Sequence, residues 1–117
     1  MDRVAQLEHN LNLVNEALAL SESADKLMRN PQFKKVIEQG YYKDEAVRLV
    51  SLLSEPSMQD PEQQQLIQNA MRGIGELKSW FNGLFRRAEQ MKKMKLDIEN
   101  ELQYISNNPT VLEEDSE

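Results

Sequence analysis

The sequence predicts an all-α protein, a small helical bundle whose long C-terminal helix forms an antiparallel coiled-coil stalk with the N-terminal helix. In the second half of the chain, apolar residues recur alternately three and four apart, which is typical of a helix covered along its length by another helix. No proline falls between Pro61 and Pro109, so one helix can run through the whole interval. The apolar positions are Ile67, Ala70, Ile74, Leu77, Phe81, Leu84, Ala88, Met91, Ile98, Leu102 and Ile105, interrupted by Lys95.

The composition narrows the class of protein. The chain has 117 residues, enough for one domain, and its 39% hydrophobic content suits helices with a single buried stripe. A net charge of −6 argues against general binding to nucleic-acid phosphates and against docking on an anionic membrane. Without cysteine, disulfides and thiolate metal sites are excluded. We find no signal peptide and no apolar run approaching the ~20 residues of a membrane span, so we expect a cytoplasmic protein.

The first helix is expected at about 2–29. Its apolar residues again alternate three and four apart, which indicates a two-helix seam. Further apolar residues broaden the stripe toward the C-terminal half, which indicates contact with more than one neighbour. The seam consists of Val4, Leu7, Leu11, Val14 and Leu18, and the broader part adds Leu13, Ala17, Leu20, Ala24, Leu27 and Met28.

Two short helices are expected next. Asn30 and Pro31 favour a helix start, and Gly40 is a natural stop, which predicts a helix at about 31–39. A third helix at about 43–54 ends before Pro56, because the residue before a proline is disfavoured in a helix. The residues expected to face inward are Phe33, Val36, Ile37, Ala46, Leu49, Val50 and Leu53.

The long helix is expected at 61–107. Asp60 and Pro61 give the start signal, and Asn108 with Pro109 stops the helix. Three glycines inside it each cost roughly 1 kcal/mol against alanine, which indicates a close helix crossing or a bend. They are Gly73, Gly75 and Gly83. Residues 1–108 then form a single helical domain, followed by an acidic disordered tail at 109–117.

One packing follows from these stripes. The first helix packs antiparallel on about 85–105 of the long helix, and the two short helices pack on its first half around Phe33, Trp80, Phe81 and Phe85. A rival packing pairs the long helix with itself in a dimer or higher oligomer. The spacing of apolar residues does not distinguish the intramolecular packing from the intermolecular one.

No residue pattern points to catalysis. His9 is the only histidine, and the carboxylates fall on polar helix faces with no motif that pairs two of them. The stretch from Gly73 to Gly75 lies inside a helical pattern with no preceding strand, so it is not a phosphate loop. We therefore expect no enzyme, no catalytic residues, no cofactor and no metal.

The features that favour protein binding are charge and exposed aromatic residues. Basic residues gather between Arg86 and Lys95 in an otherwise acidic chain, either to pair with acidic side chains of the first helix or to dock an acidic protein. Nucleic acid is the weaker option, because no aromatic residues interleave with the basic ones. Tyr42 and Trp80 lie off the main seam, and methionine beside lysines offers an adaptable contact. The predicted partner-binding residues are Arg86, Arg87, Met91, Lys92, Lys93, Tyr42 and Trp80.

Four central segments carry a family resemblance. They are NPQFKKVIEQGY at 30–41, KDEAVRL at 43–49, SEPSMQ at 54–59 and IGEL at 74–77. In this order they resemble a group of small helical proteins of tailed bacteriophages, encoded in the head and portal gene cluster and mostly uncharacterised. The resemblance covers about residues 25–85, and it implies a phage origin and a role in virion assembly.

Two functions are expected from these features. The first is a non-enzymatic virion structural or assembly protein, scaffolding-, head- or portal-associated, in the host cell cytoplasm or the virion. Its partner would be a phage structural protein or a further copy of the chain. The alternative is a phage-encoded inhibitor of a host protein such as a polymerase, nuclease or defence complex. A mimic of DNA should line acidic residues along one face, whereas basic residues interrupt the acidic surface here.

Overall fold

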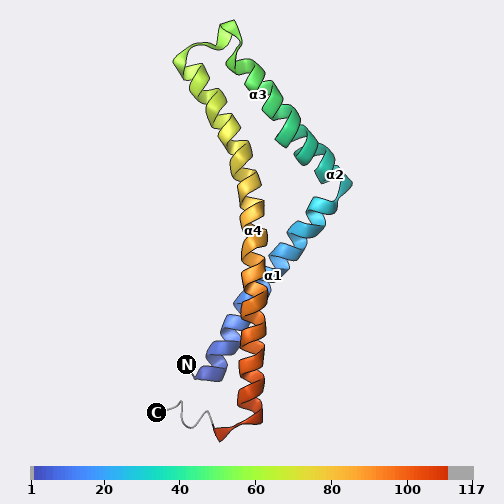
Figure 1. Ribbon diagram of the computed structural model, residues 1–117, viewed down its shortest axis with the longest axis vertical. Helices are drawn as coiled ribbons and strands as arrows, with labels where there is room; N and C mark the ends of the chain where they lie inside the picture. The colour runs from blue at the N-terminus through green and yellow to red at the C-terminus, as the bar shows by residue number, and fades with distance from the viewer. Residues whose placement is uncertain (1, 111–117) are drawn as a thin grey trace. The chain divides into compact units, whose positions relative to one another are not determined.

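The protein is helical through nearly all of the chain that its computed structural model describes, residues 2–110 (Figure 1). No strand occurs in this range, and the predicted all-α class is confirmed. The acidic tail predicted from residue 109 lies, from residue 111 onward, outside the described residues. The elements are α1 (Arg3–Arg29), α2 (Pro31–Phe33), η1 (Lys34–Glu45), α3 (Ala46–Leu53), η2 (Pro56–Met58) and α4 (Pro61–Asn107).

The described chain divides into two compact units. Residues 2–23 and 84–110 form one, which we call the terminal unit, and Ala24–Gly83 form the other, the central unit. Helices α1 and α4 each contribute to both. That residues 1–108 unfold as a single domain stays a prediction.

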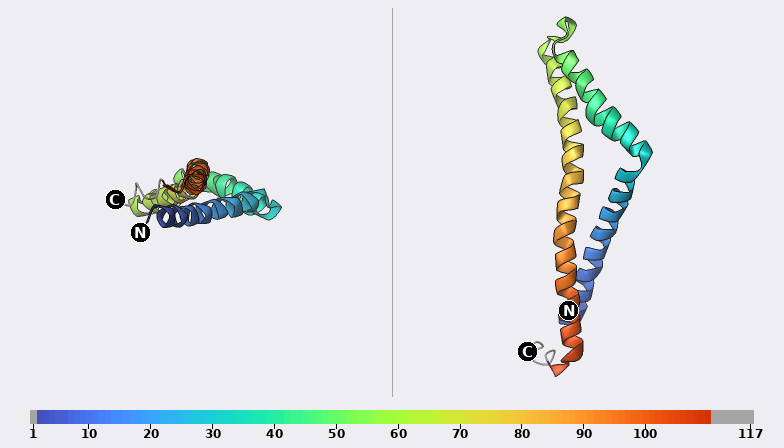
Figure 2. Two further views of the ribbon diagram at one scale, coloured as in Figure 1. Left: turned by 90° about the horizontal axis from the view of Figure 1, so that it is seen from below. Right: turned by 45° about the vertical axis from the view of Figure 1, so that its right-hand side comes forward.

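The terminal unit is an antiparallel pair of helices. Leu7 and Val14 of α1, each 3% exposed, share one buried cluster with Ile98 and Ile105 of α4. Arg3 at the start of α1 pairs with Glu101 near the end of α4, so the two helices run in opposite directions (Figures 1 and 2). The partly buried residues packed on this cluster are Val4, Leu11, Leu18, Met91 and Leu102.

The three-four spacing explains why these two helices pair. Each buried aliphatic side chain contributes roughly 1.5–3 kcal/mol relative to an exposed one, and the seam repeats this contact along the helices. Asp2 caps the start of α1, where its Oδ1 accepts the Ala5 N–H at 2.6 Å. The predicted packing of the N-terminal helix on the C-terminal half of the long helix is confirmed. Supercoiling of the pair stays a prediction.

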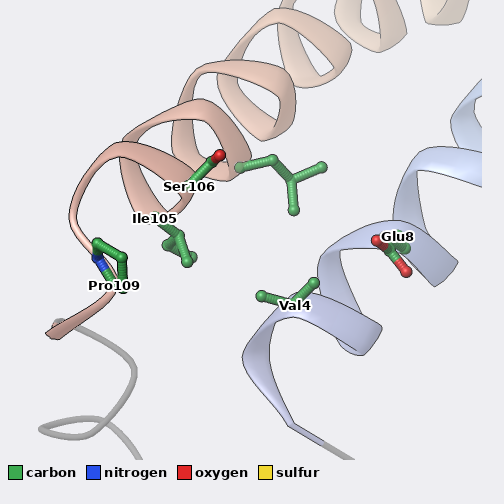
Figure 3. A pocket seen from close by; sticks show the side chains of 6 residues that line it. Val4, Glu8, Ile105, Ser106 and Pro109 are labelled. Carbon is green, nitrogen blue, oxygen red and sulfur yellow. The ribbon is translucent and has the colours of Figure 1, made fainter.

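A pocket of about 410 Å³ lies at the open end of this helix pair (Figure 3). Val4 from α1 and Ile105 from α4 face each other across it, and Pro109 closes one side. Its polar groups come from Glu8 and Ser106. The pocket is therefore the end of the apolar seam, which no third element covers among the described residues.

In the central unit, the helix from Pro31 to Leu53 is continuous, so the predicted break at Gly40 is wrong. Asn30 begins it as expected, with its Oδ1 accepting the Gln32 N–H at 2.8 Å. Gly40 does not adopt the positive φ of a helix-ending glycine. A glycine costs only about 1 kcal/mol inside a helix, and packing of Tyr41 and Tyr42 on the neighbouring core offsets that cost.

The segment η1 within this helix is a π-helix, with wider turns than an α-helix. Buried or half-buried residues recur every four positions here, as in Phe33, Ile37, Tyr41 and Leu49. A π-helix turns less per residue than an α-helix, so residues four and five apart lie on the same side of η1, as do the half-buried Ile37, Tyr41 and Tyr42. The three-four spacing by which the sequence predicts helices does not distinguish this geometry.

The core of the central unit joins α3 to the first part of α4. Leu49, Ile67 and Ile74 are buried together, and Ala46 and Leu53 pack on them as predicted. Val36 and Val50 were expected to face inward, but they are 59% and 54% exposed. Both expectations are wrong, because only one side of this helix meets α4 and these two valines lie off the buried stripe.

Aromatic packing forms a second contact in the central unit. Phe33 and Phe81 are buried, and their rings meet edge to face at 5.7 Å between centroids, as the sequence predicts for a Phe33 cluster. Trp80 packs edge-on against Phe81 at 5.2 Å but is 49% exposed. Phe85 belongs to the terminal unit and is half-buried there.

Two glutamines hold the turn where the chain reverses direction between α3 and α4 (Figure 1). Gln59 Nε2 donates to the carbonyl oxygens of Leu53 and Glu55, at 2.9 and 2.7 Å. Gln64 Nε2 donates to those of Leu53 and Met58, at 3.1 and 2.7 Å. Carbonyls left free at the end of α3 are thereby satisfied by side chains.

The glycines of α4 lead to a first prediction. Of the two alternatives for these glycines, a close crossing does not apply to Gly75, where a Cβ would meet nothing within 4 Å; a Cβ on Gly73 would lie 3.6 Å from the Tyr41 hydroxyl oxygen, an ordinary contact. Gly75→Ala should therefore raise the free energy of unfolding by about 1 kcal/mol in urea titrations. Ala70→Gly, at another exposed position of α4, is the matched control and should lower it by about the same amount. A loss of stability in Gly75→Ala would contradict the prediction.

Candidate protein-interaction surface

The predicted basic residues lie together on α4 within the terminal unit. Arg86, Arg87, Lys92 and Lys93 are exposed, and Lys95 is half-buried. All five fall within ten residues of one helix, so they span only about 14 Å along its axis. We call the four exposed residues the basic cluster.

The charges of the basic cluster are hardly neutralised within the chain. Among residues 2–110, its one ion pair joins Lys92 Nζ to Glu89 Oε1 at 3.0 Å, three residues back on the same helix. Both side chains are exposed, so this pair contributes at most a few tenths of a kcal/mol. Pairing with acidic residues of the first helix, one of the two alternatives, is absent for the basic cluster in this range.

The charged contact between α1 and α4 lies elsewhere. The Arg3 guanidinium donates from Nε and Nη2 to the Glu101 carboxylate at 2.7–2.9 Å. Both side chains are about 40% exposed, so the pair fixes register more than it adds stability. The basic cluster thus remains available to groups outside the described chain.

Met91 and Lys95 differ from the cluster because they belong to the seam. Met91 packs on the buried cluster of Leu7, Val14 and Ile98, so much of its surface already contacts its own unit. Lys95 is half-buried in line with Ile98 and Met91. A lone lysine in such a seam costs stability but restricts which helix can pair there.

Tyr42 and Trp80 belong to the central unit. Tyr42 is half-buried, with Lys78 Nζ 5.2 Å from its ring centroid; burial, then the nearby Glu38 and Tyr41, raises the pKa of its hydroxyl. Trp80 is held on one side by Phe81 and exposed on the other, the arrangement of an aromatic anchor for a partner. The predicted residues are thus divided between the two units, with the arginines, lysines and Met91 in the terminal unit and Tyr42 and Trp80 in the central unit.

The sequence did not lead us to expect an exposed surface of leucines in the terminal unit. Leu13 and Leu20 were expected to touch a further neighbour, yet they are 52% and 51% exposed. Leu96 and Tyr104 of α4 are each 57% exposed in the same unit. The spacing of seven between Leu13 and Leu20 is the signal in the sequence that places them on one side of α1.

The described residues hold no group of histidine, cysteine or carboxylate side chains suited to a metal ion. Nor does any helix in this part of the chain combine the length and apolarity required to cross a membrane. His9, Glu16 and Glu22 are exposed on α1, in keeping with solvated residues.

Comparisons with protein families, curated proteins and solved structures found no match to this chain.

Proposed function

We propose that this chain is a non-enzymatic structural or assembly protein of a phage particle, associated with the scaffold, head or portal, that acts by binding other proteins through its helices. The observation that carries the proposal is the basic cluster, whose charges lack partners on α1 among residues 2–110. An acidic segment of a phage structural protein would complement it. The phage setting rests on the resemblance of residues 25–85, and the sites of action are the host cell cytoplasm and the virion.

The alternative, an inhibitor of a host protein, has less support. A blocker of a nucleic-acid site would present acidic side chains on a continuous face, whereas the basic cluster interrupts the acidic residues of α4 between Glu76 and Asp97. Nucleic acid as a ligand is disfavoured by the net charge of −6.

Charge reversal tests the docking role. The variant Arg86→Glu/Arg87→Glu/Lys92→Glu/Lys93→Glu should keep its helicity, because all four side chains are exposed. It should bind a labelled glutamate-rich helical peptide at least about tenfold more weakly than the unmodified chain, as measured by fluorescence anisotropy.

The matched control is Lys26→Glu/Lys34→Glu/Lys35→Glu/Lys43→Glu, which reverses four exposed lysines of the central unit and reaches the same net charge. It should bind the peptide more tightly than the first variant does. Equal losses in both variants would mean that net charge alone governs binding, and tighter binding of duplex DNA than of the peptide would contradict a protein partner. Unfolding of the first variant would instead favour intramolecular pairing.

A further inference from the structure

Charge is divided unevenly along the second half of α4 and the residues that follow it. The ten residues from Arg86 to Lys95 hold five cations and one carboxylate. Lys95 is the last cation of the sequence, and every charged residue after it is acidic. The acidic positions after Lys95 are Asp97, Glu99, Glu101, Glu113, Glu114, Asp115 and Glu117. The chain thus carries a positive region and, further along, a negative one.

Carboxylates are densest at residues 113–117, which we call the acidic segment. Four of its five residues are acidic, more than in any other five consecutive residues of the chain. Fully extended, the segment covers about 14 Å, because each residue adds about 3.4 Å. The basic cluster places its four cations within about 11 Å along α4, because each helical residue adds 1.5 Å. The two regions therefore match in length and in their number of opposite charges.

The basic cluster lies on the outer side of α4. Arg86 and Lys93 are seven residues apart and fall midway between seam positions, so they share the side that faces away from the seam. Arg87 and Lys92 flank them. Of these four exposed residues, only Lys92 has an ion pair among residues 2–110, with Glu89. The cluster can therefore receive a carboxylate-rich segment that approaches from solvent.

The acidic segment of one chain cannot lie along that chain's own basic cluster. Pro109 lines the pocket at the open end of the helix pair, so the backbone is still beside the end of α4 there (Figure 3). From Pro109, Glu113 and Glu117 are at most about 14 and 28 Å away along the backbone. Lys93 lies about 21 Å before Asn107, the last residue of α4, and the two arginines lie about 30 Å before it. Even doubled back and fully extended, the segment would bring only its last residues to the near end of the cluster.

The charges near the end of α4 also oppose such a return. The last turn of α4 has no basic residue, and the C-terminal end of a helix carries a partial negative charge. Between this end and the cluster, Asp97 and Glu99 are exposed. An acidic segment folded back along its own helix would meet these like charges first. The cluster of another chain can be approached without passing them.

We propose that the acidic segment of one copy of this chain binds the basic cluster of a second copy, head to tail. This inference rests on the proposed function, because it names the acidic partner of the same cluster. A contact between two different surfaces of identical chains leaves one free cluster and one free acidic segment on every pair. Further copies can add in the same way, to an open row or a closed ring, which suits an assembly protein.

Light scattering of the full chain at increasing concentration measures this association. In about 50 mM salt we expect the mass to rise above the 13.6 kDa of one chain, and in about 0.5 M salt to return to it, because salt screens exposed charges. Two variants should each stay monomeric where the unmodified chain associates. They are the segment variant, Glu113→Gln/Glu114→Gln/Asp115→Asn/Glu117→Gln, and the cluster variant, Arg86→Gln/Arg87→Gln/Lys92→Gln/Lys93→Gln.

The matched control for the segment variant removes four exposed carboxylates elsewhere and reaches the same net charge. It is Glu16→Gln/Glu22→Gln/Glu55→Gln/Glu76→Gln, and it should associate as the unmodified chain does. Association that persists in the segment variant or in the cluster variant would overturn the proposal. So would an unmodified chain that stays monomeric in low salt up to about 1 mM.

Mixing the two monomeric variants is the sharpest test. The cluster variant keeps its acidic segment and the segment variant keeps its cluster, so one contact can form per pair. We expect a complex of twice the single-chain mass that grows no further, whereas a mixture that stays monomeric would overturn the proposal. If the unmodified chain stays monomeric but its cluster still binds the glutamate-rich peptide, this inference fails and the proposed function stands. If the peptide is not bound either, both fail.

Discussion

Replacing Ile98 by aspartate is expected to unfold the terminal unit. Ile98 is 7% exposed in the cluster with Leu7, Val14 and Ile105, and a carboxylate there would have no partner. Burying an unpaired charge and losing the apolar contact together cost about 4–5 kcal/mol or more, a large part of the stability of a small protein. Circular dichroism at 222 nm with thermal melting measures the loss of helix.

Leu96→Asp is the matched control for this variant. It adds the same charge to the same helix two residues away, but Leu96 is 57% exposed, so stability should change by only about 0.5 kcal/mol. Equal melting temperatures for the two variants would refute the seam. Since the sequence predicts one domain over 1–108, we also expect the central unit to unfold in the same transition.

Shortening Leu49 to alanine is expected to produce the second large effect. Leu49 is 4% exposed and joins Ile67 and Ile74 in the core of the central unit. Removal of a buried leucine side chain leaves a cavity and typically costs 2–5 kcal/mol, and we expect about 3 kcal/mol in urea unfolding.

The neighbouring Val50 supplies the control for Leu49→Ala. Val50 is 54% exposed, so Val50→Ala should cost well under 1 kcal/mol, and its smaller side chain suits a helix slightly better. If Val50→Ala destabilised the protein as much as Leu49→Ala, the face of α3 that meets α4 would have been assigned incorrectly.

The parts of the fold that sequence predicts well are those with a local cause. Prolines and their caps define the starts of the helix at Pro31 and of α4 at Pro61, and the three-four spacing identifies the faces that pair in the terminal unit. The continuous helix through Gly40 could not be predicted, because it depends on tyrosine packing against a distant segment. The inward placement of Val36 and Val50 failed because only one side of the helix from Pro31 to Leu53 meets α4, and both valines lie off its buried stripe.

The candidate site was predicted in part. Charge clustering located Arg86, Arg87, Lys92 and Lys93, and all four are exposed. Whether they pair with α1 depends on the register of two helices, which spacing leaves open. The Arg3–Glu101 contact sets that register.

The measurement that most directly tests the proposed function is the copy number of this protein in purified phage particles, counted by quantitative mass spectrometry against a labelled standard. We expect many copies per particle. Reversing the charges of the four basic-cluster residues should reduce the copy number at least about tenfold, whereas reversing the four central-unit lysines should not. Particles that assemble normally and contain none of the protein would contradict a structural role and favour action on a host protein instead. Undiminished incorporation of the basic-cluster variant would contradict the docking role of that cluster.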